Sequence, residues 1–139
     1  MAATKSTQAG GKVLIMDDDE TIRKMLKNML NLAGYEAEVT ADGREALEKY
    51  KNAMESLDPF SAVIMDLTVP GGMGGKEAIK NLLEIDPAAA VIVSSGYATD
   101  PIMSEYKKYG FSAVIAKPYS IKQLQETITG LNPKKKKQQ

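Results

Sequence analysis

The sequence contains no cysteine and no histidine. Without cysteine the chain can form neither disulfides nor thiolate metal sites. Without histidine it can have no histidine general base and no catalytic triad built on one, and it cannot phosphorylate itself on a histidine.

Long apolar runs are also missing. No run approaches the roughly 20 residues that span a bilayer, and residues 1–11 lack the apolar core of a secretory signal. The chain has 18 basic and 18 acidic residues, but four of the lysines are Lys134–Lys137, so the remainder is mildly acidic. We therefore expect a cytoplasmic protein without direct contact to nucleic acid or membrane.

The length of 139 residues is sufficient for one domain. We expect a disordered segment over residues 1–11, a folded domain over residues 12–132 and a Lys-rich disordered tail over residues 133–139. Five short segments have the composition of strands, and all but the second are continuous apolar runs typical of strands buried on both faces. The predicted strands are Lys12–Met16, Tyr35–Thr40, Ala62–Asp66, Ala90–Val93 and Ala113–Ala116.

Segments with apolar residues at helical spacing separate the strands, so strands and helices alternate five times. This pattern predicts a parallel sheet with helices on both faces. Apolar and charged residues alternate in Tyr35–Thr40, which favours an edge position. The predicted fold is a flavodoxin-like, three-layer, doubly wound (βα)5 fold with strand order 2-1-3-4-5.

In this order the first and third strands are neighbours, and their carboxyl ends bring Asp17, Asp18 and Asp66 into one crevice. Three carboxylates would repel one another without a cation. An all-oxygen ligand set favours Mg²⁺. The backbone carbonyl of Thr68, two residues after Asp66, is a further candidate ligand.

Two more polar residues end strands at the same edge: Ser95 and Lys117. A hydroxyl, an ammonium and Mg²⁺ together can hold the oxygens of a phosphoryl group. We therefore predict that Asp66 accepts a phosphoryl group covalently, with Lys117 and Ser95 assisting. Such a protein catalyses its own phosphorylation and the hydrolysis of the product, and it is not a conventional turnover enzyme.

The motifs VLIMDDDE, VIMDLTVP, VIVSSG and VIAKPY, in this order, resemble a response-regulator receiver domain of two-component systems over Lys12 to about Leu131. The resemblance implies that Asp66 is the phosphoacceptor, that Asp17, Asp18, Asp66 and the Thr68 carbonyl hold Mg²⁺, and that the donor is a phosphohistidine on a histidine kinase or phosphotransfer protein. It implies that phosphorylation moves Ser95 inward and reshapes the face formed by helix four, strand five and helix five. This face is also the expected surface for any homodimer.

Three features depart from the usual family pattern: a residue of strand five, a loop, and the residues that control access of water. Val114 stands where strand five often carries a rotating aromatic residue. The loop Gly71–Gly75 is Gly-rich and longer than usual, which predicts a mobile loop and is typical of receivers attached to hybrid sensor histidine kinases. Tyr97, two residues after Ser95, and Thr68 occupy positions that control access of water to the phosphoaspartate, so Tyr97→Ala is expected to change the lifetime of the acyl phosphate.

Two alternatives compete with this interpretation. The segment Asp17–Thr21 also resembles the DxDxT motif of haloacid-dehalogenase-type phosphatases, with Asp17 as nucleophile and Asp19 as general acid and base, but that interpretation leaves Asp66 unexplained. The other alternative is a receiver-like binding module that works without phosphorylation.

Overall fold

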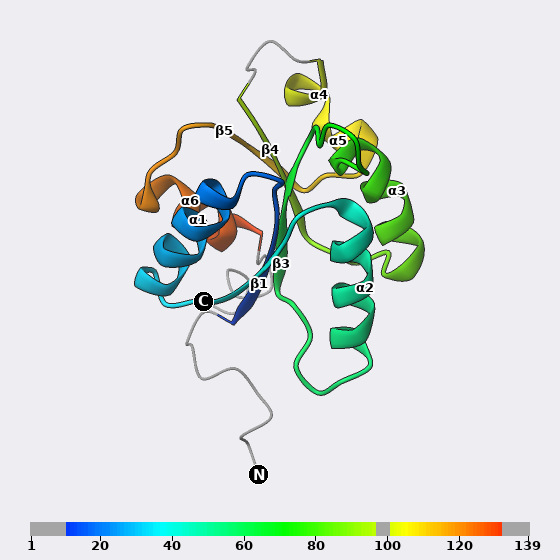
Figure 1. The fold of residues 1–139 in the computed structure, drawn as a ribbon, viewed down its shortest axis with the longest axis horizontal. Coiled ribbons are helices and arrows are strands. Elements are labelled where there is room, and N and C mark those ends of the chain that lie inside the picture. The colour runs from blue at the N-terminus through cyan, green and yellow to red at the C-terminus, as the bar shows by residue number, and fades with distance from the viewer. Residues whose placement is uncertain (1–10, 97–100, 132–139) are drawn as a thin grey trace.

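The structure, a computed structural model, describes residues 11–96 and 101–131. Within these ranges five parallel strands form one sheet in the order β2-β1-β3-β4-β5, which confirms the predicted fold (Figure 1). The segments predicted to be disordered, 1–11 and 133–139, lie outside the described residues except for Gly11. The strands are β1 (Lys12–Met16), β2 (Glu36–Thr40), β3 (Ala62–Asp66), β4 (Val91–Ser95) and β5 (Ala113–Ala116).

Six helices connect and flank these strands in the described part of the chain. Asp19 caps the first of them by accepting hydrogen bonds from the backbone N–H groups of Thr21 and Ile22, and Ser120 forms a complete capping box with Gln123 at the last. None of the described helices has the length and apolarity needed to cross a membrane. The helices are α1 (Glu20–Leu32), α2 (Gly43–Met54), α3 (Gly75–Ile85), α4 (Pro101–Ser104), α5 (Tyr106–Tyr109) and α6 (Ile121–Gly130).

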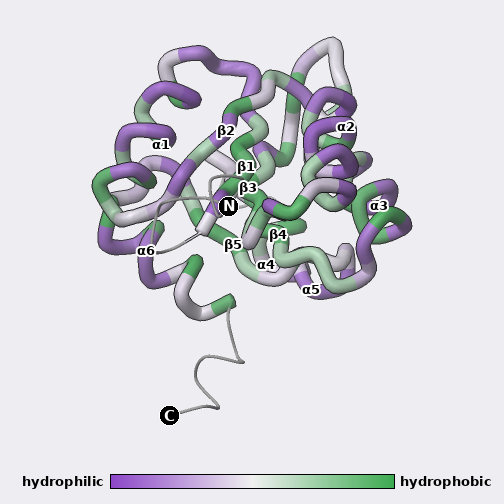
Figure 2. Tube along the Cα trace, turned by 90° about the horizontal axis from the view of Figure 1, so that it is seen from below, coloured by the Kyte–Doolittle hydropathy of each residue, from purple (hydrophilic) through white to green (hydrophobic). Residues whose placement is uncertain are grey.

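The helices cover the two faces of the sheet unequally. Helices α1 and α6 pack on one face, which we call the α1–α6 face, and α2, α3, α4 and α5 pack on the other, the α2–α5 face (Figure 1). Hydrophobic residues run along the strands in the middle, and hydrophilic residues lie on the surrounding helices (Figure 2). β1, β3 and β4 are buried along their whole length, which is why their sequences carry no alternation.

The segment between β4 and β5, where the alternation of strands and helices predicts one helix, contains two short helices in the structure. Residues Pro101–Ser104 form α4 and Tyr106–Tyr109 form α5, because Glu105 between them has non-helical dihedral angles, φ −116° and ψ 27°. Gly110 ends α5 in the left-handed region, at φ +102°, where glycine is favoured. Periodicity alone predicts one helix here, since it does not register a single residue that leaves helical geometry.

The Gly-rich loop between β3 and α3 packs more closely than its composition predicts. The carbonyl of Met73 accepts a 2.7 Å hydrogen bond from the N–H of Gly43 at the start of α2, and the Met73 side chain packs against the core. A Cβ atom at Gly74 would lie 2.6 Å from the carbonyl oxygen of Leu67. At Gly74, therefore, glycine permits close packing next to the end of β3. The mobility of the loop stays a prediction.

Candidate functional site

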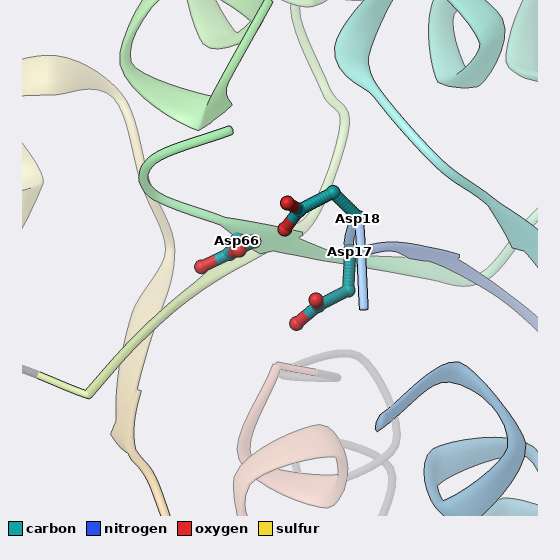
Figure 3. Close-up of side chains that lie close together, drawn as sticks. All are labelled: Asp17, Asp18 and Asp66. Carbon is teal, nitrogen blue, oxygen red and sulfur yellow. The ribbon is translucent and has the colours of Figure 1, made fainter. Parts of the chain in front are cut away.

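Three aspartates meet at the carboxyl ends of β1 and β3, as the sequence predicted (Figure 3). One carboxylate oxygen from each of Asp17, Asp18 and Asp66 lies within 4.8 Å of the others. Asp17 and Asp66 are buried, and Asp18 is exposed. The close approach follows from the register, because Met16 of β1 pairs with Met65 of β3 and the next residue of each strand is an aspartate.

Hydrogen bonds around Asp17 fix the turn that carries the first two aspartates. The Asp17 N–H donates to the carbonyl of Thr40, the last residue of β2, over 3.1 Å, so the start of the turn is held to the neighbouring strand. The Asp17 side chain accepts from the N–H of Asp19 at 2.9 Å, and the Arg23 guanidinium donates to the Asp17 carbonyl at 2.9 Å. Asp19 itself caps α1, so it is not available to the cluster.

Lys117 connects two of the aspartates. Its Nζ atom donates to Asp17 Oδ2 at 2.9 Å and to Asp66 Oδ1 at 3.3 Å. Burial by itself lowers the pKa of Lys117, but the hydrogen bonds and negative charges of Asp17 and Asp66 outweigh burial and raise this pKa above its usual value. Lys117 therefore carries a positive charge that offsets part of the charge of the three carboxylates.

Asp66 has a perturbed pKa. Burial and the negative charge of Asp17 raise it from 3.8 to about 6, while the charge and hydrogen bond of Lys117 oppose this rise. Desolvation and like charges both disfavour an ionised carboxylate. A divalent cation among these oxygens would reverse the balance, so the excess of negative charge and the all-oxygen ligand set fit Mg²⁺.

An open pocket of about 460 Å³ lies over the cluster and gives access to it. The predicted Ser95 ends β4, is buried and lines this pocket, so the structure brings it together with Lys117 and Asp66. The remaining lining residues are Asp18, Thr68, Pro70 and Gly96. Val114 lies two residues before Ala116, the β5 residue that pairs with Ser95, and is half-buried against the core on the face covered by α2, α3, α4 and α5. The predicted tuning residue Tyr97 lies outside the described residues.

Sequence reasoning missed two residues near the site. Arg23 holds the Asp17 carbonyl, and its signal in the sequence was a basic residue within the first turn of a helix that follows an acidic run. Tyr119, two residues after Lys117, is buried among residues of the α1–α6 face. Its signal was an aromatic residue directly after the Lys-Pro pair, although a buried tyrosine alone does not indicate a role in a site.

The comparisons with known proteins agree with this geometry. The family model for the response regulator receiver domain matches residues 13–129. The chemotaxis protein CheY of Thermotoga maritima is 39% identical over 120 residues, covering 86% of this chain and 95% of that protein.

Solved structures show the same similarity. A receiver domain protein from Clostridium thermocellum superposes with a TM-score of 0.80 at 25% identity, covering 93% of this chain and 99% of that one. The CheX–CheY–BeF3–Mg complex from Borrelia burgdorferi contains a chain that superposes with a TM-score of 0.76 at 30% identity, covering 87% of this chain and 88% of that one.

This chain belongs to the response regulator receiver domain family. It is a CheY-like phosphoacceptor domain of two-component signal transduction. Because the match extends from β1 through α6, it favours the receiver interpretation over a phosphatase built on Asp17.

Proposed function

We propose that Asp66 is the residue that accepts the phosphoryl group from a phosphohistidine on a histidine kinase or phosphotransfer protein. The observation that carries this proposal is the position of Lys117, whose ammonium contacts Asp66 at 3.3 Å beside an open pocket. Asp17 and Asp18 lie close enough to Asp66 to share one metal ion with it. We assign Mg²⁺ to Asp17, Asp18, Asp66 and the backbone carbonyl of Thr68.

The chemistry follows from the groups in the pocket. A carboxylate oxygen of Asp66 attacks the phosphorus atom, an O–P bond forms, and the P–N bond to the donor imidazole breaks with its electron pair left on nitrogen. No general base is required, because Asp66 is mostly ionised at neutral pH even with its pKa raised to about 6. When bound, Mg²⁺ neutralises charge on the phosphoryl oxygens.

Lys117 and Ser95 act on the phosphoryl group itself in this proposal. Lys117 donates to the phosphoryl oxygens from the β5 side of the pocket, and the Ser95 hydroxyl donates from the end of β4. Attachment of the phosphoryl group draws Ser95 toward it, and the movement reaches the neighbouring β5 through the Ser95–Ala116 pair. The surface formed by α4, α5, β5 and α6 is then the one that changes, and it is our candidate surface for downstream partners or for a homodimer.

Three smaller points concern the location of the protein, the lifetime of the phosphoaspartate and attachment to a larger protein. A cytoplasmic location suits a chain without cysteine. Thr68 and Tyr97 tune the hydrolysis of the phosphoaspartate, with Thr68 lining the pocket beside Asp66. Attachment to a hybrid histidine kinase stays a prediction from the composition of the loop after β3.

The test is phosphorylation by acetyl phosphate with Mg²⁺, followed by intact-mass measurement. The wild-type protein is expected to gain one phosphoryl group that hydroxylamine removes, and Asp66→Asn is expected to gain none. Asp19→Asn is the matched control, because asparagine also caps helices and Asp19 lies outside the cluster. Phosphorylation of Asp66→Asn at the wild-type level would refute the assignment.

Two further measurements, hydrolysis of small phosphate esters and binding of beryllofluoride, separate the two alternatives. A phosphatase would hydrolyse small phosphate esters and lose this activity in Asp17→Asn, whereas Asp66→Asn would keep it. A binding module would take up no phosphoryl group and would not bind beryllofluoride in the presence of Mg²⁺.

A further inference from the structure

Two buried hydroxyls beside the candidate site, Ser94 Oγ and Tyr119 Oη, make no hydrogen bond of good geometry among the described residues, although they lie close enough for Ser94 to lower the pKa of Tyr119. Ser94 is 2% exposed and Tyr119 is 8% exposed. A buried hydroxyl without a partner costs roughly 1–3 kcal/mol, so two of them side by side require an explanation.

Both residues lie beneath the site on the α1–α6 face of the sheet. Asp66 pairs with Ser94 in the β3–β4 register, and paired residues of parallel strands point to the same face. Tyr119 follows Lys117 by two positions and packs with Ile64, Ile92 and Ile115 on that face. The two hydroxyls are therefore enclosed between the hydrophobic core and the ion pairs of Lys117.

Electrostatic effects agree with this placement. Burial raises the pKa of Tyr119, the Ser94 hydroxyl and the Lys117 ammonium lower it, and the charges of Asp17 and Asp66 raise it. The Tyr119 hydroxyl therefore lies within the influence of every charged group on the buried side of the cluster.

Lys117 has one hydrogen-bond donor left over. An ammonium has three N–H donors, and two are directed to Asp17 and Asp66. No acceptor in the described ranges takes the third. Three polar groups with unused capacity, namely this N–H and the two hydroxyls, match the two to four partners that a buried water requires.

We propose that Ser94 and Tyr119 are positioning residues for Lys117: a water bound between their hydroxyls accepts the third N–H of the ammonium and directs Lys117 toward Asp66. The inference rests on the proposed role of Asp66 and deepens it. Phosphoryl transfer depends on placement of the charged groups. An ammonium held by three partners has less freedom to turn away from the phosphoryl oxygens than one held by two.

The test compares variants that differ by a single hydroxyl. Tyr119→Phe removes only the phenolic oxygen, and Ser94→Thr and Ser94→Val give side chains of the same shape with and without a hydroxyl. We expect Tyr119→Phe and Ser94→Val to slow phosphorylation by acetyl phosphate about three- to tenfold, with Ser94→Thr close to wild type. If Tyr119→Phe does not fold, the Ser94 pair decides the result.

A double-mutant cycle distinguishes positioning from a general loss of stability. If the hydroxyls act through Lys117, Tyr119→Phe slows the reaction in the wild-type background but has no further effect in Lys117→Ala. An unchanged rate in Tyr119→Phe, or an equal slowing in both backgrounds, would overturn the inference. A crystal structure at high resolution should also show a water that contacts Ser94 Oγ and Tyr119 Oη.

Failure of this inference is distinguishable from failure of the proposed function. If Asp66→Asn takes up a phosphoryl group, the assignment of the phosphoacceptor is wrong. If Asp66→Asn is inactive and Tyr119→Phe reacts at the wild-type rate, only the positioning role is wrong.

Discussion

Lys117 Nζ lies 2.9 Å from Asp17 Oδ2, although the two residues are 100 positions apart in the sequence. The contact crosses the sheet from the end of β5 toward the end of β1, over the ends of β3 and β4. The side chain of Asp17 is 3% exposed and that of Lys117 is 21% exposed, so the ion pair is largely removed from water.

The first prediction concerns loss of the lysine. Lys117→Ala leaves Asp17 and Asp66 buried without their cation, and breaking such a pair costs about 3–5 kcal/mol. We expect this loss in the free energy of unfolding in EDTA, measured by urea denaturation. Mg²⁺ should increase the free energy of unfolding more in Lys117→Ala than in wild type, because in the variant it supplies the missing positive charge. Equal stabilisation of both proteins by Mg²⁺ would contradict this.

The second prediction concerns the pH dependence of stability. The pKa of Asp66 is raised from 3.8 to about 6 in the folded state, so the folded protein binds a proton more tightly than the unfolded chain. In EDTA, the contribution of Asp66 to stability therefore falls as the pH rises from about 4 to 6. Asp66→Asn removes this cost, and we expect it to be more stable than wild type at pH 7 by about 1–3 kcal/mol, with part of the effect screened by solvent.

The control for this measurement is the stability difference at pH 4. There Asp66 is protonated in the folded protein, and the advantage of Asp66→Asn should nearly disappear. Thermal unfolding followed by circular dichroism across this range gives both values. A pH-independent difference would show that the asparagine acts through packing instead of charge.

The third prediction concerns the metal. A ligand that binds only the folded state stabilises it in proportion to the logarithm of its concentration, so Mg²⁺ should raise the melting temperature of the wild-type protein. Asp18→Asn should remove most of this shift, because it takes away one of the three carboxylates that can hold the metal. Since Asp18 is the exposed member of the cluster, the substitution should leave the fold intact. Asp19→Asn retains the cap of α1 and should respond to Mg²⁺ as wild type does.

The fourth prediction concerns the contact between the β3–α3 loop and α2. A Cβ atom at Gly43 would lie 2.8 Å from Ala78 Cβ and 2.9 Å from Met73 Cγ, so Gly43→Ala should destabilise the protein by about 1–3 kcal/mol. At Gly130 a Cβ atom would meet nothing within 4 Å. Gly130→Ala should therefore be neutral or stabilising by up to about 1 kcal/mol, as measured by urea denaturation.

The fifth prediction concerns the link between α2 and the end of α3. The Tyr50 hydroxyl donates a 2.6 Å hydrogen bond to Asp86 Oδ2, and burial together with this carboxylate raises the pKa of Tyr50. Tyr50→Phe should lower the free energy of unfolding by about 1–3 kcal/mol, because Asp86 loses a donor to a charged acceptor. Tyr106→Phe, at a half-buried position on α5, is the matched control and should change stability less.

The sequence alone predicted the fold and most of the candidate site. Four predicted strands contain an uninterrupted run of apolar residues, which is typical of strands in a buried parallel sheet. Asp66 had to lie at a strand end because a buried strand cannot hold an unpaired charge at its middle. Strand order then brought Asp17, Asp18 and Asp66 together without any knowledge of side-chain positions.

Tertiary structure decided what depends on distances between side chains. Only packing shows that Lys117 contacts two aspartates, that Arg23 holds the Asp17 carbonyl and that Met73 anchors the Gly-rich loop. Only packing likewise shows that the hydroxyls of Ser94 and Tyr119 are buried next to the site. Hydrophobic periodicity reports which face of an element is buried, but a hydrogen bond depends on positions within a few tenths of an ångström, and those are fixed only when the elements pack.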